Sequence, residues 1–343
     1  MGRDALPSVS VIMPIRNEAR YVGACLSAVS AQAYPRDRLE IVCAEGGSSD
    51  ATRKLLESAA AEDTRILVVD NPSGRTPDAL NASLAVAHGE VIVRMDAHAV
   101  PPPDYIASCV ASLRRTGAWC VGGRMLKEGE RAKSAAIAAA TSSRFGVGDS
   151  SFHYATSGQF VESVFLGCWP RWVFDRIGGF DPELTRNQDD ELSYRIREAG
   201  GSIWFDPSIS VRYYGRGSFR HLFEQHRQYG FWKIRVFQKH PGAARWRHFV
   251  PAALVACPLV IVTGPGAPRR VATIGVGAYL MATAVSAARI ARVRPELRFL
   301  DIAVAFAAMH FGYGIGFWQG TLRFVANWLP ARLPRRGDAT SRD

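Results

Sequence analysis

Short apolar runs rich in β-branched residues alternate with stretches of helical spacing through the first third of the chain. Such alternation predicts repeated βα units with short links, and therefore an α/β fold built on a doubly wound, mostly parallel sheet. The expected strands are 8–15, 39–45, 65–70, 90–96 and 118–125, and the expected helices are 18–33, 50–56, 77–87 and 103–115.

Polar residues collect where these strands end. Arg16-Asn17-Glu18 follows the first strand, Glu45-Gly46-Gly47 the second, and Asp96-Ala97-His98 the fourth. Arg75 and Asn81 lie around the start of the third helix, at the same edge. Because doubly wound sheets bind ligands at the carboxyl ends of their strands, we expect one site here.

Asp96 and His98 can point to the same side, because side chains alternate along a strand. Together they can share a divalent cation, which would neutralise a diphosphate and stabilise it as a leaving group. Oxygen ligands favour Mg²⁺, and an imidazole ligand shifts the preference toward Mn²⁺. Taken alone, Asp-x-His is equally compatible with a turn that starts at Asp96 and a surface His98.

The second half of the chain has a different character. From 126 to 159 the periodicity weakens and 145–158 reads as a loop, before regular structure resumes at Val161. Three apolar segments then follow, about 249–265, 271–290 and 300–321. Spanning a bilayer takes about 20 apolar residues, so the last two are long enough and the first is marginal. We expect membrane insertion; buried helices of a soluble domain are the alternative.

Basic clusters at 269–270, 289–294 and 332–336 flank these segments. Basic residues favour the cytoplasmic side of a membrane, yet any three-span topology places one cluster outside. Two spans with a surface-lying or re-entrant segment would remove the conflict.

Composition narrows the class of partner. The 343 residues are 48% hydrophobic and carry a formal net charge of +11, which suits nucleic acid, a membrane surface or a phosphorylated substrate. The apolar segments and the lack of a recognition motif argue against a nucleic-acid-binding protein. The six cysteines form no C-x-x-C pair and read as buried free thiols. The polar N-terminus lacks the apolar core of a signal peptide, so we expect the first domain in the cytoplasm.

An ordered set of motifs resembles the inverting family-2 glycosyltransferases, whose fold is the GT-A nucleotide-sugar fold. The resemblance covers roughly Ser8 to Arg220 and is strongest to membrane-bound transferases of succinoglycan-type exopolysaccharide assembly. The motifs are PIRNE, EGGSSDAT, ALNAS, RMDAHA, GGFDPEL and NQDDELSYRI.

The resemblance implies donor-side roles around the strand ends. Asp96 would contact the ribose and a Mn²⁺ or Mg²⁺ ion, and His98 would take the second acidic position of the usual Asp-x-Asp as a metal ligand. Glu45 stands where the family usually has Asp, so the choice of uridine over guanosine is less secure. The other expected donor-binding residues are Pro14, Arg16, Glu18, Arg75 and Asn81.

The resemblance also implies that Asp189 is the catalytic base. A carboxylate of pKa about 4 is too weak to deprotonate a free alcohol, so proton transfer must be concerted with attack on the anomeric carbon. Asp190 and Glu191 are competing bases, and Asp190 is also an expected acceptor contact, with Glu162 and Trp169. The acidic run equally suits the start of a helix, where the dipole stabilises it.

Val211 to Arg247 is densely basic and aromatic. The mixture is typical of a membrane-surface helix. It also suits a segment that closes over the donor diphosphate, as many family members have, with Gln225, Arg227 and Trp232 as the loose match.

The expected protein is a metal-dependent, inverting hexosyltransferase on the inner face of the plasma membrane. It would move a sugar to a lipid-linked saccharide, and the resemblance implies a UDP-sugar as the donor. Other polysaccharide-assembly proteins are the expected further partners. A polyprenyl phosphate acceptor and an inactive sugar-binding scaffold are the alternatives. The expected domains are a GT-A domain over 1–245 (nucleotide-binding half 8–125, acceptor half 126–220, basic interfacial segment 211–247), apolar helices over 248–325 and a basic tail over 326–343.

Overall fold

The computed structural model describes residues 6–129, 132–148, 155–215 and 217–325. The strands are β1 Val9–Ile15, β2 Leu39–Glu45, β3 Ile66–Asp70, β4 Val91–Arg94, β5 Ala99–Val100, β6 Cys120–Glu128, β7 Gln159–Phe160, β8 Phe165–Pro170 and β9 Ile203–Tyr214. The helices are α1 Val22–Ser30, α2 Thr52–Glu62, α3 Thr76–Val86, α4 Tyr105–Thr116, α5 Ala132–Thr141, α6 Arg144–Val147, α7 Arg171–Ile177, α8 Gln188–Glu198, α9 Phe219–Lys239, α10 Val250–Thr263, α11 Gly266–Val293 and α12 Phe299–Phe324. Short 3₁₀ turns cover Arg36–Arg38, Pro241–Ala243 and Trp246–His248.

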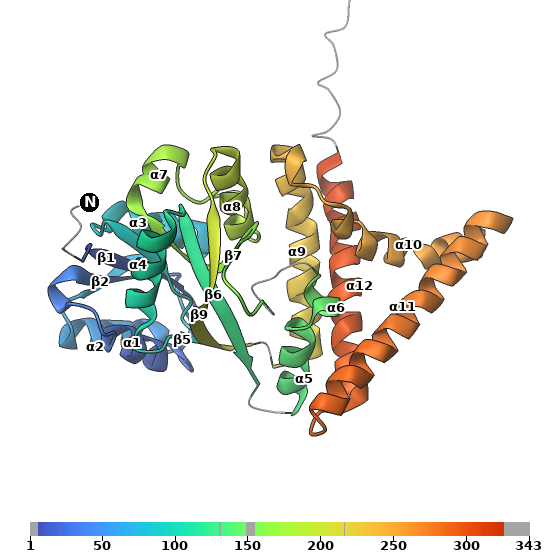
Figure 1. The fold of residues 1–343 in the computed structure, drawn as a ribbon, viewed down its shortest axis with the longest axis horizontal. Helices are drawn as coiled ribbons and strands as arrows, with labels where there is room; N and C mark the ends of the chain where they lie inside the picture. The colour runs from blue at the N-terminus through green and yellow to red at the C-terminus, as the bar shows by residue number, and fades with distance from the viewer. Residues whose placement is uncertain (1–5, 130–131, 149–154, 216, 326–343) are drawn as a thin grey trace, which may run out of the picture.

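One mixed sheet carries the first two-thirds of the molecule (Figure 1). Its strand order is β3-β2-β1-β4-β8-β6-β9-β5, with β7 paired to β9. The first four strands in this order are parallel, and β8 runs antiparallel between β4 and β6. The predicted α/β fold with a mostly parallel sheet is therefore confirmed.

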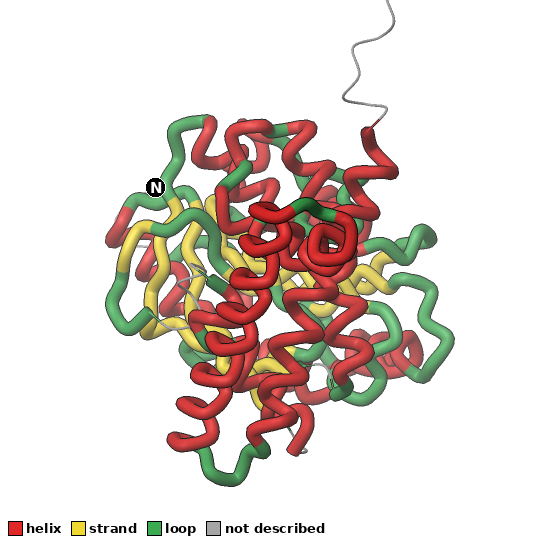
Figure 2. Tube along the Cα trace, turned by 90° about the vertical axis from the view of Figure 1, so that its right-hand side faces the viewer, coloured by secondary structure: helices red, strands yellow, loops and turns green. Residues whose placement is uncertain are grey.

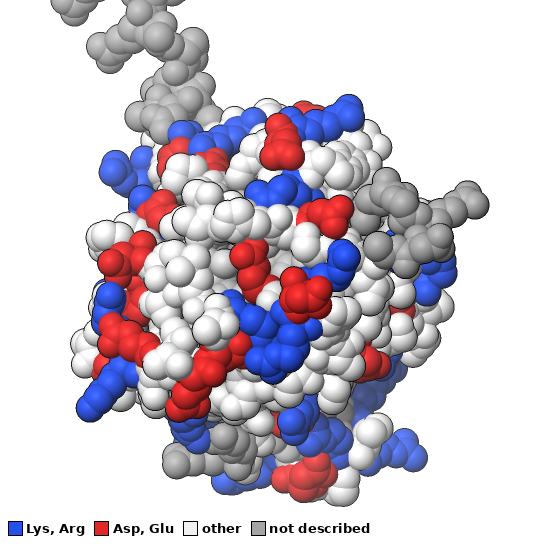
Figure 3. All heavy atoms as spheres, turned by 90° about the vertical axis from the view of Figure 1, so that its left-hand side faces the viewer, with Lys and Arg blue, Asp and Glu red and all other residues white. Residues whose placement is uncertain are grey.

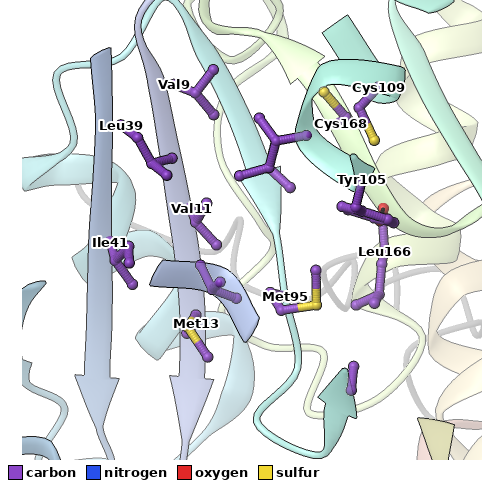
Figure 4. Close-up of a cluster of buried hydrophobic side chains, with 14 of the residues drawn as sticks. Val9, Val11, Met13, Leu39, Ile41, Met95, Tyr105, Cys109, Leu166 and Cys168 are labelled. Carbon is purple, nitrogen blue, oxygen red and sulfur yellow. Dashed lines mark hydrogen bonds between the residues drawn. The ribbon is translucent and has the colours of Figure 1, made fainter. Parts of the chain in front are cut away.

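Two apolar cores cover the two faces of this sheet. Along β1, Val11 and Met13 face the core shared with α1, α2 and α4, whereas Ile12 between them faces the core shared with α3, α7 and α8. Figure 4 shows the first core, in which β-strand side chains meet Tyr105 of α4 and Leu166 of β8. Burial on both faces explains why these strands read as unbroken apolar runs.

The cysteines are free thiols in the described part of the chain, as predicted. Five are buried in the cores and Cys257 of α10 is half-buried. Burial raises the pKa of Cys43 to about 12, so this thiol stays protonated and unreactive at neutral pH.

Helix α5 was not expected, because the alanine-rich stretch after β6 has little amphipathic contrast. Its buried face, which includes Ile137 and Ala140, packs against Phe306 of α12. On its other side, Lys127 of β6 donates a hydrogen bond from Nζ to the Thr141 carbonyl, at 3.0 Å. Burial lowers the pKa of Lys127 to about 7.

Beyond the sheet, α9 and α12 lie side by side (Figure 1), in a layer of helices that Figure 2 shows from the outside. Three glycines spaced four apart on α12 face the α9 backbone. A Cβ on Gly312 would lie 2.6 Å from the Phe223 carbonyl oxygen, one on Gly320 would lie 2.5 Å from that of Phe231, and one on Gly316 would overlap that of Arg227. The helices are in backbone contact, and no side chain fits between them at these positions.

The apolar segments form the expected helices. Among the described residues, α11 and α12 are long and apolar enough to cross a membrane by length and composition, and α10 is shorter. The basic segment at 211–247 contains α9, which has one face on α12. The proposed domain boundaries stay a prediction.

Replacing Gly316 by Ala tests the α9–α12 contact. The added methyl must push the two backbones apart, so we expect a loss of about 1–3 kcal/mol in the free energy of unfolding. Gly275→Ala on α11 is the matched control, because a Cβ there meets nothing within 4 Å. It should be neutral or stabilise by up to about 1 kcal/mol. Denaturant unfolding of both variants measures this, and equal effects would contradict the close contact.

Replacing Lys127 by Met removes a half-buried amine that lines the cleft described below. The pKa of Lys127 is about 7 in the fold and about 10.4 in an unfolded chain. Between these values the unfolded state binds more protons, so wild-type stability rises from pH 7 toward pH 10. We therefore expect the variant to be more stable at pH 7, by on the order of 1–3 kcal/mol, with the difference closing toward pH 10. Denaturant unfolding across this range measures it, and a pH-independent difference would contradict the burial of a charge.

Candidate active site

A cleft of about 910 Å³ runs along the carboxyl ends of β1 and β4 and continues between α8, α5 and α9. Strand-end residues Pro14, Arg16 and Glu18 line it, as do Arg75, Asp96 and His98. Asp189 and Asp190 at the start of α8 line the same cleft. Residues far apart in the sequence thus meet at one edge of the sheet. Glu45, Asn81, Glu162 and Trp169 are not among the lining residues.

Backbone-directed hydrogen bonds fix the loop after β1 against the loop after β2. Asn17 adopts a left-handed conformation, with φ of 54°. Its backbone N–H donates to Ser48 Oγ at 2.9 Å, and its side-chain oxygen accepts from the Ser49 N–H at 2.8 Å. The Glu18 N–H donates to Thr52 Oγ1 at 2.8 Å. Contacts from the loop after β2 and from the start of α2 therefore hold the backbone that carries Arg16 and Glu18 in place.

Glu45 stabilises the loop after β2 through hydrogen bonds to its backbone. Its buried carboxylate accepts hydrogen bonds from the backbone N–H groups of Gly47 (3.1 Å) and Ser48 (2.7 Å) and from Arg53 Nη1 (3.0 Å). Burial alone would raise the pKa of Glu45, but these hydrogen bonds outweigh it and hold the pKa below its usual range. Its oxygens are engaged inside the chain, and the predicted contact with the donor base stays a prediction.

Arg75 and Asn81 differ in what they contact. Arg75 lines the cleft, and its Nη1 donates to the Pro182 carbonyl at 3.0 Å. The amide of Asn81 donates to the Phe180 carbonyl at 2.7 Å and accepts from the Phe180 N–H at 2.8 Å. Asn81 therefore clips α3 to the Gly178–Asp181 loop that precedes α8.

Arg94 is a site residue that sequence reasoning missed. This buried guanidinium lies on β4, with Nε 3.1 Å from Asp96 Oδ1 and Nη1 3.7 Å from Asp189 Oδ2. Burial lowers the pKa of Arg94, but the two carboxylates outweigh it and raise the pKa above its usual value. The available signal was a single cation inside the otherwise apolar run VIVRM, residues 91–95.

His98 is held between two partners. Its Nδ1 lies 3.1 Å from Glu18 Oε1, and its Nε2 lies 2.6 Å from the Tyr213 hydroxyl. Pairing of β5 with β9 places Tyr213 here. A neutral ring with its proton on Nδ1 satisfies both contacts, since it donates to Glu18 and accepts from Tyr213. Metal ligation by Nε2 requires the Tyr213 hydroxyl to move away.

Asp96, Glu18 and His98 are the candidate ligands of the expected cation. Among the described residues, no three His, Cys, Asp or Glu side chains are grouped so that they could hold a metal ion. Asp96, Glu18 and His98 nevertheless line one stretch of the cleft. Mg²⁺ is commonly held by one or two carboxylates together with substrate phosphates rather than by a complete protein cage. The residues present fit a cation that binds together with a diphosphate.

The acidic run at the start of α8 divides into three environments. Glu191 is buried and accepts from Arg195 Nε at 2.7 Å, and Asp190 pairs with Lys233 Nζ at 2.5 Å. Burial would raise the pKa of Asp190, but Lys233 more than offsets it and the pKa is lowered. Asp189 is 44% exposed, and its recorded ion-pair partner is Arg94 at 3.7 Å. Of the three carboxylates, Asp189 is the least engaged.

Neither predicted acceptor contact upstream of α8 reaches the cleft wall. Glu162 accepts hydrogen bonds from Arg245 (2.9 Å) and Arg247 (2.7 Å), at the segment that leads into α10. Trp169 is 4% exposed and packs edge-on against Phe174 and Phe180 in the core. The structure assigns both residues a structural environment, and their contact with an acceptor stays a prediction.

Comparison with known proteins identifies relatives along the whole chain. A sequence profile described as Glycosyl transferase family 2 matches residues 10–151. The succinoglycan biosynthesis protein ExoA of Rhizobium meliloti (strain 1021) is 30% identical over 328 residues, which cover 94% of this chain and 98% of that protein. A Methanococcus voltae protein is 25% identical over 326 residues, covering 92% of this chain and 97% of its own length. It is named dolichyl N-acetyl-α-D-glucosaminyl phosphate 3-β-D-2,3-diacetamido-2,3-dideoxy-β-D-glucuronosyltransferase.

Solved structures share the fold. The mannosyltransferase PcManGT from Pyrobaculum calidifontis, solved with GDP-Man and Mn²⁺, superposes with a TM-score of 0.59 at 21% identity, covering 90% of this chain and 88% of that one. TarS residues 1–349 of S. aureus gives 0.51 at 16% identity, covering 92% and 91%. With a curated relative matched over nearly its full length and this fold, the chain belongs to glycosyl transferase family 2 and has the GT-A architecture.

Proposed function

We propose that this glycosyltransferase moves one sugar from a nucleotide-sugar, a UDP-sugar in our expectation, to a lipid-linked saccharide with inversion at the anomeric carbon. The observation that carries the proposal is the Asp96–Arg94–Asp189 arrangement, in which one buried guanidinium contacts a strand-end carboxylate and a carboxylate at the start of α8. This arrangement supports the proposal, because a carboxylate suited to the donor side lies near a carboxylate suited to the acceptor hydroxyl, and both line one cleft.

On the donor side, Asp96, with Glu18 and His98 beside it, would hold a Mn²⁺ or Mg²⁺ ion together with the diphosphate. When bound, the cation neutralises the charge that develops on the leaving diphosphate. Arg16 and Arg75 line the same part of the cleft and supply further positive charge. The family resemblance is the basis for the expected position of the nucleoside and for the residues that would contact its base.

On the acceptor side, Asp189 takes the proton of the attacking hydroxyl as the new glycosidic bond forms and the bond to the diphosphate breaks. A single displacement of this kind inverts the anomeric centre. Its position in the first turn of α8 suits a carboxylate, since the helix dipole favours negative charge there. The neighbouring Gln188 is buried and borders the cleft, and its Oε1 has no hydrogen-bond partner among the residues that the structure describes. A sugar hydroxyl would satisfy that oxygen.

The acceptor class is supported by the relatives. The Rhizobium meliloti protein is named for succinoglycan biosynthesis, and the Methanococcus voltae protein is named for a lipid-linked sugar phosphate acceptor. The chain spans nearly their full lengths, including the apolar helices, which suits a substrate anchored in a membrane. We therefore place the enzyme in surface polysaccharide assembly, on the cytoplasmic side of the membrane.

Asp189→Asn tests the base. We expect turnover to fall by about a hundredfold to ten-thousandfold, because the amide cannot accept the proton, while donor binding stays near the wild-type value. Release of nucleoside diphosphate from a screen of donors, with Mn²⁺ and a lipid extract, measures the rate. Asp37→Asn on the surface is the matched control. If Asp190→Asn loses turnover and Asp189→Asn keeps it, Asp190 is the base.

His98→Ala tests the metal ligand. If the imidazole binds the cation, the Mn²⁺ concentration that supports UDP binding should rise by about tenfold or more. Calorimetric titration of UDP at graded Mn²⁺, with EDTA as the metal-free reference, measures it. His88→Ala, at an exposed site outside the cleft, is the control. An unchanged Mn²⁺ dependence would mean that His98 serves only to bridge Glu18 and Tyr213.

A further inference from the structure

We propose that Lys127 binds the phosphate of a lipid-linked saccharide acceptor, at the end of the cleft between β6, α5 and α9. The inference rests on the proposed function and deepens it, because it names the group of the acceptor that is recognised and the residue that recognises it. The chemistry required is that of a phosphate oxyanion, which both the acceptor and the donor diphosphate carry.

The two ends of the cleft differ in charge. Glu18 and Asp96 line the donor end, and Asp189 and Asp190 line it at the start of α8. In the described part of the chain, the lining residues that β6, α5 and α9 contribute include no Asp or Glu. On the face of the molecule opposite the helical layer, by contrast, acidic and basic residues are interspersed (Figure 3). The walls from β6, α5 and α9 therefore lack the negative charge that would oppose an anionic ligand.

Lys127 supplies a cation at this end of the cleft. The side chain is half-buried and lines the cleft. Among the residues that the structure describes, its ammonium contacts the Thr141 carbonyl, at 3.0 Å, and no carboxylate. Lys233 and Lys239, the other described lysines that are not exposed, each pair with a carboxylate at 2.5 Å. Because an ammonium can donate three hydrogen bonds, Lys127 has N–H groups left for a ligand.

The position of Lys127 costs stability at neutral pH. Burial lowers the pKa of its ammonium to about 7, so at this pH the folded chain holds the proton less firmly than the unfolded chain does. An oxyanion beside the ammonium would restore the full charge, because a nearby opposite charge favours the charged form. An ionisable group that destabilises the free protein and lies in a cleft is typical of a functional site.

His226 of α9 adds a neutral polar group to the same end of the cleft. Burial lowers the pKa of its imidazole to about 4, and the charge of Lys127 lowers it further, so the ring is neutral at pH 7. Its Nδ1 lies 3.0 Å from the Leu222 carbonyl, which can only accept a hydrogen bond. The proton is therefore on Nδ1, and Nε2 is left as an acceptor that suits a sugar hydroxyl.

The wall around Lys127 is shared with the apolar helices. Ile137 of α5 and Leu222 of α9 line the cleft, and both are buried in one cluster with Phe306 of α12. Figure 1 shows α5 between the sheet and α12. A phosphate bound to Lys127 would therefore lie close to apolar helices as well as in the cleft that holds Asp189. A saccharide joined to a lipid through phosphate requires such an arrangement.

The donor diphosphate is the other source of a phosphate oxyanion. Arg16 and Arg75 line the cleft at the strand ends, where Asp96 also lies. These two cations contact the carbonyls of Gly74 and Pro182, whereas the ammonium of Lys127 contacts α5. The donor end thus has cations of its own, and the charge of Lys127 is left for the acceptor.

Lys127→Met tests the assignment through turnover. Nucleoside diphosphate release is measured at graded concentrations of lipid extract and, separately, of donor. The lipid concentration that gives half the maximal rate should rise by about tenfold or more, because a charge-assisted hydrogen bond is lost, and the KM for the donor should not change. Lys127→Arg keeps a cation and should restore most of the affinity. Lys133→Met, at an exposed position on α5, is the matched control.

The same variant separates recognition from a structural role. If Lys127 serves only to cap α5 through the Thr141 carbonyl, Lys127→Met should lose stability at pH 7 and keep the wild-type dependence on lipid. Higher stability together with weaker use of the lipid extract supports the proposal. An unchanged lipid dependence, or a rise in the KM for the donor instead, would overturn it.

Binding of a short prenyl phosphate tests the ligand without turnover. The purified full chain should bind geranyl phosphate more tightly than geraniol, as followed by NMR titration, and Lys127→Met should remove most of that difference. Saturating UDP with Mn²⁺ should leave the binding of geranyl phosphate unchanged. Equal binding of the alcohol, or displacement of geranyl phosphate by UDP, would overturn the proposal. If no donor yields nucleoside diphosphate, the proposed function fails, and this titration still reports the phosphate site separately.

Discussion

The burial of Arg94 is the constraint around which the catalytic cleft is organised. A guanidinium removed from water costs several kcal/mol unless carboxylates compensate it. Two carboxylates compensate this charge. Asp96 lies two residues further along the chain, and Asp189 lies far away in sequence, at the start of α8. The ion pairs of this one strand residue therefore link the loop after β4 to the start of α8. The same interaction holds a strand of the sheet and the proposed catalytic carboxylate.

Prediction from sequence succeeded where local pattern and global position coincide. Apolar runs at β1, β2 and β4 specify buried parallel strands, and the polar residues after them necessarily share an edge. Local pattern says less where tertiary contacts decide. Backbone N–H groups engage the Glu45 carboxylate and aromatic rings surround Trp169, and neither environment can be read from the neighbouring residues. Helix α5 was not expected because its alanine-rich sequence has little amphipathic contrast and its partner α12 lies far along the chain.

The apolar helices show a second limit of prediction from sequence. Length and hydropathy describe α12 as a span, but those measures average over all faces of a helix. Its glycine face is shaped for a polar neighbour, α9, and the information lies in which residues are small rather than in how many are apolar. The basic clusters in the sequence conflict only with a three-span topology, and the number of spans stays a prediction.

Asn81 has a consequence outside catalysis. The tripeptide Asn81-Ala82-Ser83 matches the acceptor signal for N-linked glycans. Its amide nitrogen, the atom to which a glycan is joined, already donates to the Phe180 carbonyl, and its oxygen accepts from the same residue. An oligosaccharide at that nitrogen would break these hydrogen bonds and separate α3 from the loop before α8. The folded state therefore masks this sequon by itself, whatever compartment the protein enters.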